Sequence, residues 1–291
     1  MTDFHDAIRS AGLIPPEHIV PGRLHRFPGR GKRSTNRAGW CLLFDDRRGG
    51  VFGDWSTGHT ETWQAQHRGA PTPVERSAFY RMVEAAKARA KAEQSARHEA
   101  ASKRAQTIWN DAKPAPDDHP YLLRKHIARH GARFHRGCLV MPVVDFTGNL
   151  TSLQFIAADG GKRLLSGGRK RGCYIPVASG PERPERVIIC EGWATGCTLA
   201  EDEPEALVLA AIDAGNLKSV ALGARRRWPE ATLIVAGDDD RLTPGNPGRT
   251  KAMEAARAAG CLLALPQWPA DAPDTLTDFN DLAEWLLGGA P

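Results

Sequence analysis

The chain has 291 residues and a mass of 31.7 kDa; 41% of its residues are hydrophobic and 25% are charged. This composition is ordinary for a globular protein and excludes a wholly disordered one, and the length favours about two domains. The longest apolar run, residues 206–212, is far too short to span a bilayer, and no charged-then-apolar leader opens the chain. We therefore expect a cytoplasmic protein with no membrane partner.

The charge is distributed unevenly along the chain. Residues 1–181 hold 29 basic and 16 acidic residues, whereas residues 182–291 hold 10 basic and 18 acidic residues. The basic front half suggests a polyanionic partner. The acidic back half suggests carboxylates gathered around divalent metal ions, with solvated charged faces as the alternative in both halves. None of the six cysteines forms a C-x-x-C pair, so we expect neither zinc nor a disulfide framework.

Residues 1–70 are predicted to form a small β-rich module. A short helix over residues 3–11 precedes strands at 24–27, 39–44 and 51–55, which are bounded by turn residues. Arginines interleaved with aromatic residues suit single-stranded nucleic acid, with Arg26 and Trp55 as candidate contacts. The alternative is that the aromatic residues form the core of the sheet.

Residues 71–113 are predicted to be a connector. Residues 74–112 are rich in alanine and charged residues and contain neither proline nor glycine, a composition typical of a helix. Few large apolar residues occur in its second half, so we expect an exposed helix.

Residues 114–182 are predicted to be a basic lobe. Strands at 138–145 and 150–156, joined by Phe-Thr-Gly-Asn, indicate a β-hairpin. Basic residues cluster directly after the hairpin, around two glycines: Lys162, Arg163, Arg169, Lys170 and Arg171.

Residues 183–291 alternate between strands and helices, which predicts a parallel sheet with helices on its faces, an α/β fold. The predicted strands are residues 187–190, 206–212, 231–236 and 262–265. The predicted helices are residues 194–201, 217–226 and 250–259.

Carboxylates follow two of these strands directly. Glu191 and Gly192 follow the first strand, and Asp238, Asp239 and Asp240 follow the third. Ligands of such sheets bind beyond the carboxyl ends of the strands, so these acids are expected in one crevice. Clustered carboxylates repel one another unless a cation bridges them, and Mg²⁺ prefers such ligands. The alternative is a solvated acidic loop.

The pattern of Glu191-Gly192 after one strand and Asp238 and Asp240 after a later strand resembles the TOPRIM domain. That domain occurs in DnaG-type primases, topoisomerases and some nucleases. Further motifs resemble the TOPRIM primases of plasmids and phages, including TraC-type primases: Cys190-Glu-Gly-Trp-Ala-Thr-Gly196, Asp213-Ala-Gly-Asn-Leu217, Gly245-Asn-Pro-Gly248, Thr277-Asp-Phe-Asn-Asp281, His119-Pro-Tyr-Leu122 with Lys125, Leu139-Val-Met-Pro142 and Leu153-Gln-Phe-Ile156. The resemblance covers about residues 118–285. It implies a Rossmann-like parallel sheet with flanking helices, preceded by a basic α+β lobe.

The resemblance also implies roles for individual residues. Glu191 would act as a metal ligand or general base, and Asp238 and Asp240 would bind Mg²⁺ or Mn²⁺. Asp239 is less clearly implied, and Asp278 and Asp281 would either complete the metal site or cap the last helix. Nucleotide phosphates or the template backbone would be held by the basic residues Lys125, Lys162, Arg163, Arg169, Lys170 and Arg171.

The front module is similar to the N-terminal region of phage and plasmid primase proteins. In DnaG-type primases a zinc ribbon occupies this place, but this chain lacks the paired cysteines, so any template contact would be made without zinc. No G-x-x-x-x-G-K-[ST] phosphate loop is present, so a helicase would have to be a separate protein.

The leading hypothesis is a DNA primase that makes short RNA primers on single-stranded DNA from ribonucleoside triphosphates, in plasmid or phage replication. A TOPRIM metal-dependent nuclease could use the same carboxylates, although it has no need of a basic nucleotide-binding lobe. A non-catalytic single-stranded DNA-binding accessory protein is the third possibility.

Overall fold

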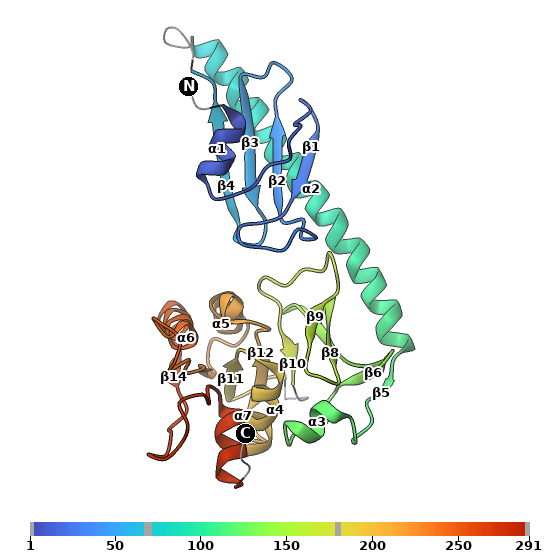
Figure 1. Cartoon of the computed structure of the whole chain (residues 1–291), viewed down its shortest axis with the longest axis vertical. Helices are drawn as coiled ribbons and strands as arrows, with labels where there is room; N and C mark the ends of the chain where they lie inside the picture. The colour runs from blue at the N-terminus through green and yellow to red at the C-terminus, as the bar shows by residue number, and fades with distance from the viewer. Residues whose placement is uncertain (1–2, 67–71, 178–181, 289–291) are drawn as a thin grey trace. The chain divides into compact units, whose positions relative to one another are not determined.

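The computed structural model describes residues 3–66, 72–177 and 182–288 (Figure 1). The chain forms two compact units, Met1–Ala96 and Arg97–Pro291. This division is coarser than the four predicted segments, whose boundaries at 71, 114 and 183 remain predictions. In the ranges that the structure describes, no helix is both long enough and apolar enough to cross a membrane.

The first unit is built on an antiparallel sheet with the strand order β1-β2-β3-β4. Its elements are α1 (Phe4–Ser10), β1 (Leu24–Phe27), β2 (Gly39–Leu43), β3 (Gly49–Asp54) and β4 (His59–Gln64). The predicted helix and three strands are confirmed, but the sequence reading missed β4. This strand is largely exposed, and its polar residues do not alternate with buried ones.

Both faces of this sheet are covered. Trp40, Phe44 and Val51 lie in one core cluster with residues of the long helix α2 (Pro73–Asp111). Phe27 and Phe52 lie in another cluster, with residues of α1. Most of the aromatic residues considered as stacking platforms are therefore core residues, and Trp55 is only partly buried.

Helix α2 lies where the sequence predicts a helix, and most of its residues are exposed as expected, but one side of it is partly buried. Val83, Ala86 and Ala90 are buried in the first unit, and Ala101 and Ala105 are buried in the second. Alanine has too small a side chain to give a clear apolar stripe in the sequence, yet it allows a helix to pack closely against a sheet.

The second unit begins with an antiparallel sheet of the strand order β5-β6-β7-β8-β9. Its elements are β5 (Lys113–Pro114), α3 (Pro120–Arg124), β6 (Arg133–His135), β7 (Cys138–Val144), β8 (Leu150–Ala157) and β9 (Lys162–Leu164). The predicted hairpin is confirmed as β7 and β8. Asp145 stabilises its turn, since Oδ1 accepts hydrogen bonds from the backbone N–H groups of Thr147 and Asn149.

The remaining elements form the α/β fold expected from the alternating pattern. The strands run in the order β10-β12-β11-β13-β14, and β12, β11, β13 and β14 are parallel. Their bounds are β10 (Ile175–Pro176), β11 (Arg186–Cys190), β12 (Leu207–Ala210), β13 (Thr232–Ala236) and β14 (Leu262–Ala264). The helices are α4 (Trp193–Asp202), α5 (Ala214–Arg227), α6 (Pro247–Ala259) and α7 (Phe279–Leu286).

Helices cover both faces of this parallel sheet (Figure 1). Residues of α5 and α6 share a core cluster with Val187, Ile189 and Leu209, whereas residues of α4 pack with Ile188 and Val208, which point to the opposite face. Because both faces are buried, the strands are almost continuous apolar runs.

The two sheets of the second unit are joined. The segment leading into β10 makes an isolated bridge between Tyr174 and Val144 of β7, and β10 itself pairs antiparallel with β12. One core cluster contains Leu139 and Ile156 of the basic lobe together with Val208 of the parallel sheet. The basic lobe is therefore held directly against the sheet that carries the acidic residues.

Candidate active site

Acidic residues gather at the carboxyl edge of the parallel sheet. Glu191 follows β11 directly, Asp238 follows β13 after one glycine, and Asp213 follows β12 after two residues. These three strands are neighbours, and Cys190 at the end of β11 is in register with the last residues of both β12 and β13. The prediction that Glu191 and the three consecutive aspartates share one edge is therefore confirmed for the backbone.

The carboxyl of Glu191 is largely buried and lies near other acidic residues. Burial raises the pKa of its carboxyl, and the charges of Asp213 and Asp240 raise it further. A hydrogen bond from the backbone N–H of Ala214 and the charge of Lys162 act in the opposite direction. The buried position of Glu191 beside other acidic groups thus favours the protonated form of its carboxyl more than water would.

Asp238 is more strongly perturbed. Burial, followed by the charges of Glu191, Asp278 and Asp240, raises its pKa from 3.8 to about 8. Its Oδ1 is buried and has no hydrogen-bond partner among the residues that the structure describes. A buried carboxylate oxygen without a partner is unfavourable unless it is protonated or bound to a cation. The residue therefore has the properties of a metal ligand.

The other two aspartates are fixed by helix α6 and its surroundings. Oδ2 of Asp240 accepts a hydrogen bond of 2.8 Å from the backbone N–H of Gly248, in the first turn of α6. A Cβ at Gly248 would lie 2.9 Å from both Asp238 Cβ and Asp240 Oδ2, so only glycine fits between them. Asp239 instead accepts hydrogen bonds from Asn246 Nδ2 and Trp268 Nε1, at 2.7 and 3.1 Å, which indicates a structural role.

The sequence implies a divalent cation at this edge of the sheet. Among residues 3–66, 72–177 and 182–288, no three histidine, cysteine or acidic side chains are arranged to hold one ion. Mg²⁺, however, is usually bound by one or two carboxylates, with water and substrate phosphates as its other ligands. The unpartnered oxygen of Asp238 beside Asp240 fits a site of that kind.

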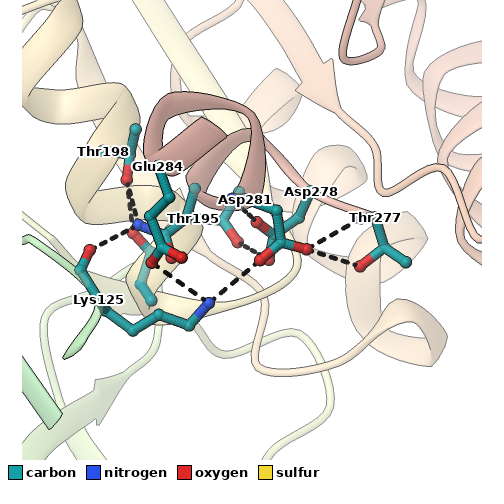
Figure 2. Close-up of polar contacts among 9 residues, drawn as sticks. Lys125, Thr195, Thr198, Thr277, Asp278, Asp281 and Glu284 are labelled. Atoms are coloured by element: carbon teal, nitrogen blue, oxygen red, sulfur yellow. Dashed lines mark hydrogen bonds and ion pairs between the residues drawn. The ribbon is translucent and has the colours of Figure 1, made fainter. Parts of the chain in front are cut away.

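Asp278 lies close to the same edge and also caps a helix. It is the N-cap residue of α7, where Oδ1 accepts a hydrogen bond of 2.9 Å from the backbone N–H of Asp281. Oδ2 accepts a hydrogen bond of 3.0 Å from Thr195 Oγ1 of α4 (Figure 2). Of the two roles that the sequence left open for Asp278, the capping of the last helix is confirmed. Its part in a metal site stays a prediction, and its charge also raises the pKa of Asp238.

Of the predicted basic contacts, Lys162 is close enough to the acidic edge to affect two of its carboxylates. It is exposed at the start of β9, and its charge lowers the pKa of both Glu191 and Asp238. A Cβ at Gly192 would lie 4.0 Å from its Nζ. Arg163 is exposed beside it, with its guanidinium 4.0 Å from the centre of the Phe155 ring. Both side chains are accessible to an incoming phosphate.

The glycine-rich basic loop is fixed next to the acidic edge. Arg169 pairs with Asp145 at 2.5 Å, and Lys170 forms an ion pair with Asp213. Asn216, at the start of α5, donates hydrogen bonds from Nδ2 to the carbonyl oxygens of Lys170, Cys173 and Ala211. Its Oδ1 accepts a hydrogen bond from the backbone N–H of Gly172. Arg171 is an exposed member of the same loop.

The sequence reading assigned no role to Asn216, although the residue belongs to a quoted motif. The signal available in the sequence was its position in the first turn of the helix that follows β12. The burial of Asn216 is visible only in the structure. Asn216 is 2% exposed, so its amide must find hydrogen-bond partners inside the protein.

The remaining predicted contacts have other partners. Lys125 contacts acidic residues of α7, as described below. Arg26 and Trp55 belong to the first unit, where the guanidinium of Arg26 lies 3.9 Å from the centre of the Trp55 ring and 3.2 Å from a carboxylate oxygen of Glu93. Their roles in binding nucleic acid remain predictions.

Comparison with known proteins identifies the part of the chain that carries this edge. Residues 186–285 match the family described as Toprim domain. This part of the chain is therefore similar to a Toprim domain. It is also related to proteins called DNA primase TraC from Escherichia coli, with 34% identity over 287 residues and 32% over 284 residues. Each alignment covers 91% of this chain, but only 26% and 19% of the two TraC proteins, so the chain spans about a quarter or less of their length.

Solved structures with some similarity to part of this chain include two that are described as primases. The DnaG primase catalytic domain bound to single-stranded DNA has 12% identity and a TM-score of 0.43, covering 62% of this chain and 74% of that one. The bacteriophage T7 primase domain, in a complex with the lagging-strand DNA polymerase, has 16% identity and a TM-score of 0.40, covering 57% of this chain and 79% of that one.

Proposed function

We propose that this protein is a DNA primase, which synthesises short RNA primers on single-stranded DNA from ribonucleoside triphosphates. The observation that carries the proposal is the pairing of two features in one compact unit. Perturbed carboxylates lie at the edge of the parallel sheet, and the exposed cations Lys162 and Arg163 lie on the lobe packed beside them. The relationship to the TraC primases supports the same activity.

In this mechanism Glu191 accepts the proton of the attacking primer 3′-hydroxyl. The hydroxyl oxygen bonds to the α-phosphorus of the incoming nucleotide, and the bond from that phosphorus to the leaving pyrophosphate breaks. A divalent cation, Mg²⁺ or Mn²⁺, held by Asp238 and Asp240 with Asp278 beside them, would stabilise the charge on the phosphates. Lys162, Arg163 and Lys170 would orient the triphosphate.

The ion pair between Lys170 and Asp213 fits this role. An incoming triphosphate offers Lys170 a more highly charged partner than one carboxylate, so the lysine can exchange Asp213 for phosphate. The residues of the first unit, including Arg26 and Trp55, would contribute to template binding. A separate helicase would supply the unwound template, and cytoplasmic plasmid or phage replication is the proposed setting.

Primer synthesis on single-stranded DNA of mixed sequence tests the proposal. The reactions contain labelled ribonucleotides with Mg²⁺ or Mn²⁺, and compare the wild type with Glu191→Gln and Asp238→Asn. Glu205→Gln, an exposed acid of the same unit, is the matched control.

Short RNA products from the wild type and the control, and none from the two site variants, are expected. Metal-dependent shortening of the DNA without RNA products would indicate a nuclease instead. Salt-sensitive DNA binding with neither activity would indicate an accessory protein and refute the primase assignment.

A further inference from the structure

Lys125 is the predicted phosphate contact whose surroundings fit that role least. It follows α3 directly, and its side chain is 26% exposed. Its Nζ lies 3.1 Å from Oδ1 of Asp281 and 3.6 Å from Oε1 of Glu284, both on α7 (Figure 2). A phosphate would have to displace two carboxylates from this ammonium, whereas Lys170 has only one such partner.

The backbone of Lys125 is tied to the same helix. Asn280 of α7 donates hydrogen bonds from Nδ2 to the carbonyl oxygen of Lys125, at 2.8 Å, and to Thr198 Oγ1 of α4, at 3.0 Å. Asn280 is 2% exposed, so these contacts are shielded from water. Lys125 therefore connects the basic lobe to α7 through both its side chain and its backbone.

This connection leads to the acidic edge. Asp281, the partner of Lys125, also accepts hydrogen bonds at Oδ2 from the backbone N–H and hydroxyl of Thr277. The backbone N–H of Asp281 in turn donates to Asp278 Oδ1. The position of the first turn of α7 thus determines where the carboxylate of Asp278 lies relative to Asp238.

The charges make this contact persistent. Burial alone would lower the pKa of Lys125, but Asp281, Asp278 and Glu284 together raise it, so the ammonium stays charged at neutral pH. Oε1 of Glu284 is buried and accepts no hydrogen bond in the part of the chain that is described, so the nearby ammonium is its main compensation. Removing Lys125 would leave two carboxylates repelling each other.

We propose that Lys125 is a positioning residue: by binding Asp281 and Glu284 it holds α7 against the basic lobe and thereby sets Asp278 in the cation site, rather than binding the nucleotide. The expected effect of Lys125 on primer synthesis rests on the proposed function. Its expected effect on cation binding does not. Mutation of residues that orient metal ligands typically lowers metal affinity or activity about 10- to 100-fold.

Two measurements on the full chain test the proposal. Mn²⁺ binding is followed by isothermal titration calorimetry, and primer synthesis is followed as a function of ribonucleotide concentration. The variants are Lys125→Met, Lys125→Arg and Glu284→Gln, with Lys162→Met as the contrasting lysine. Thermal unfolding identifies any variant that does not fold, and Glu284→Gln, which removes only the more distant acid, is the milder alternative.

Lys125→Met is expected to weaken Mn²⁺ binding and lower kcat, each by about tenfold, with KM for nucleotides within about twofold of the wild type. Lys125→Arg is expected to restore most of both losses, and Glu284→Gln to change both in the same direction as Lys125→Met. Lys162→Met is expected to raise KM instead, as a phosphate contact would.

A raised KM with unchanged Mn²⁺ affinity in Lys125→Met would overturn the positioning role. If the wild type binds Mn²⁺ and makes no primers, the proposed function fails, whereas weaker Mn²⁺ binding by Lys125→Met would still support the inference. If Lys125→Met binds Mn²⁺ like the wild type, the inference fails whether or not primers are made.

Discussion

Replacing Asp238 by asparagine should stabilise the protein when no metal ion is present. The pKa of Asp238 is raised from 3.8 to about 8 in the folded protein, because the carboxyl is buried near Glu191, Asp278 and Asp240. In the unfolded chain the same carboxyl ionises near pH 4. The folded state therefore loses stability as the pH rises from about 4 to 8, since only the unfolded state gains from ionisation over that range.

The size of this loss of stability follows from the difference between the pKa values of Asp238 in the folded and unfolded states. Each pH unit between the two pKa values contributes about 1.4 kcal/mol, which gives an upper limit of about 4 kcal/mol at pH 7. The Asp238 side chain is not fully closed off from solvent, and the new amide must itself be desolvated. We therefore expect Asp238→Asn to raise the free energy of unfolding by about 2 kcal/mol at pH 7, a rise in Tm of about 4–8 °C.

Differential scanning calorimetry of the full chain, with a chelator present, checks this expectation. The gain in Tm should be largest near pH 8 and should vanish below about pH 4, where the carboxyl is protonated in both states. Added Mg²⁺ should raise the Tm of the wild type more than that of the variant. Glu205→Gln, an exposed control, should change little. An Asp238→Asn variant that is no more stable than the wild type at pH 8 would refute the mutual repulsion of these carboxylates.

Two further predictions concern loops. Asn216→Ala removes three hydrogen bonds between the basic loop and α5 and a fourth to Ala211, so it should lower stability by about 1–3 kcal/mol and raise KM for ribonucleotides, as urea unfolding and primer assays would show. Unchanged KM would mean that the loop does not hold phosphate. Asp54→Ala removes a buried acceptor for the backbone N–H groups of Arg30 and Ser56, so it should destabilise the first unit by about 2–3 kcal/mol. Urea unfolding checks this, and an unchanged midpoint would contradict it.

The fold of the second unit was predictable because its strands and helices have distinct patterns. The strand β11 is a short, continuous apolar run, and the helix α4 follows it after a glycine, so the α/β alternation is visible without any structure. The first unit was less predictable. Strand β4 is mostly exposed and polar, and its pairing with β3 is specified by the partner strand rather than by its own residues.

The candidate site was predictable to the extent that it depends on strand ends. Glu191 and Asp238 each follow a strand of a parallel sheet, and the topology alone brings them to one edge. The partners of the basic residues were not predictable, because ion pairs such as Lys125 with Asp281 join residues far apart in the chain. A lysine in a motif can bind phosphate or a carboxylate, and only its neighbours in three dimensions distinguish the two.

The short strand β10 has a practical consequence for dividing the protein. It covers the outer edge of β12, and the residues just before and after it hydrogen-bond to Val144 and Val208. A fragment that begins at the predicted Toprim boundary, residue 183, would leave the edge of β12 unpaired and would expose apolar residues of the shared core. Such edges promote association between chains. The Toprim domain and the basic lobe should therefore be expressed, purified and exchanged between proteins as a single piece.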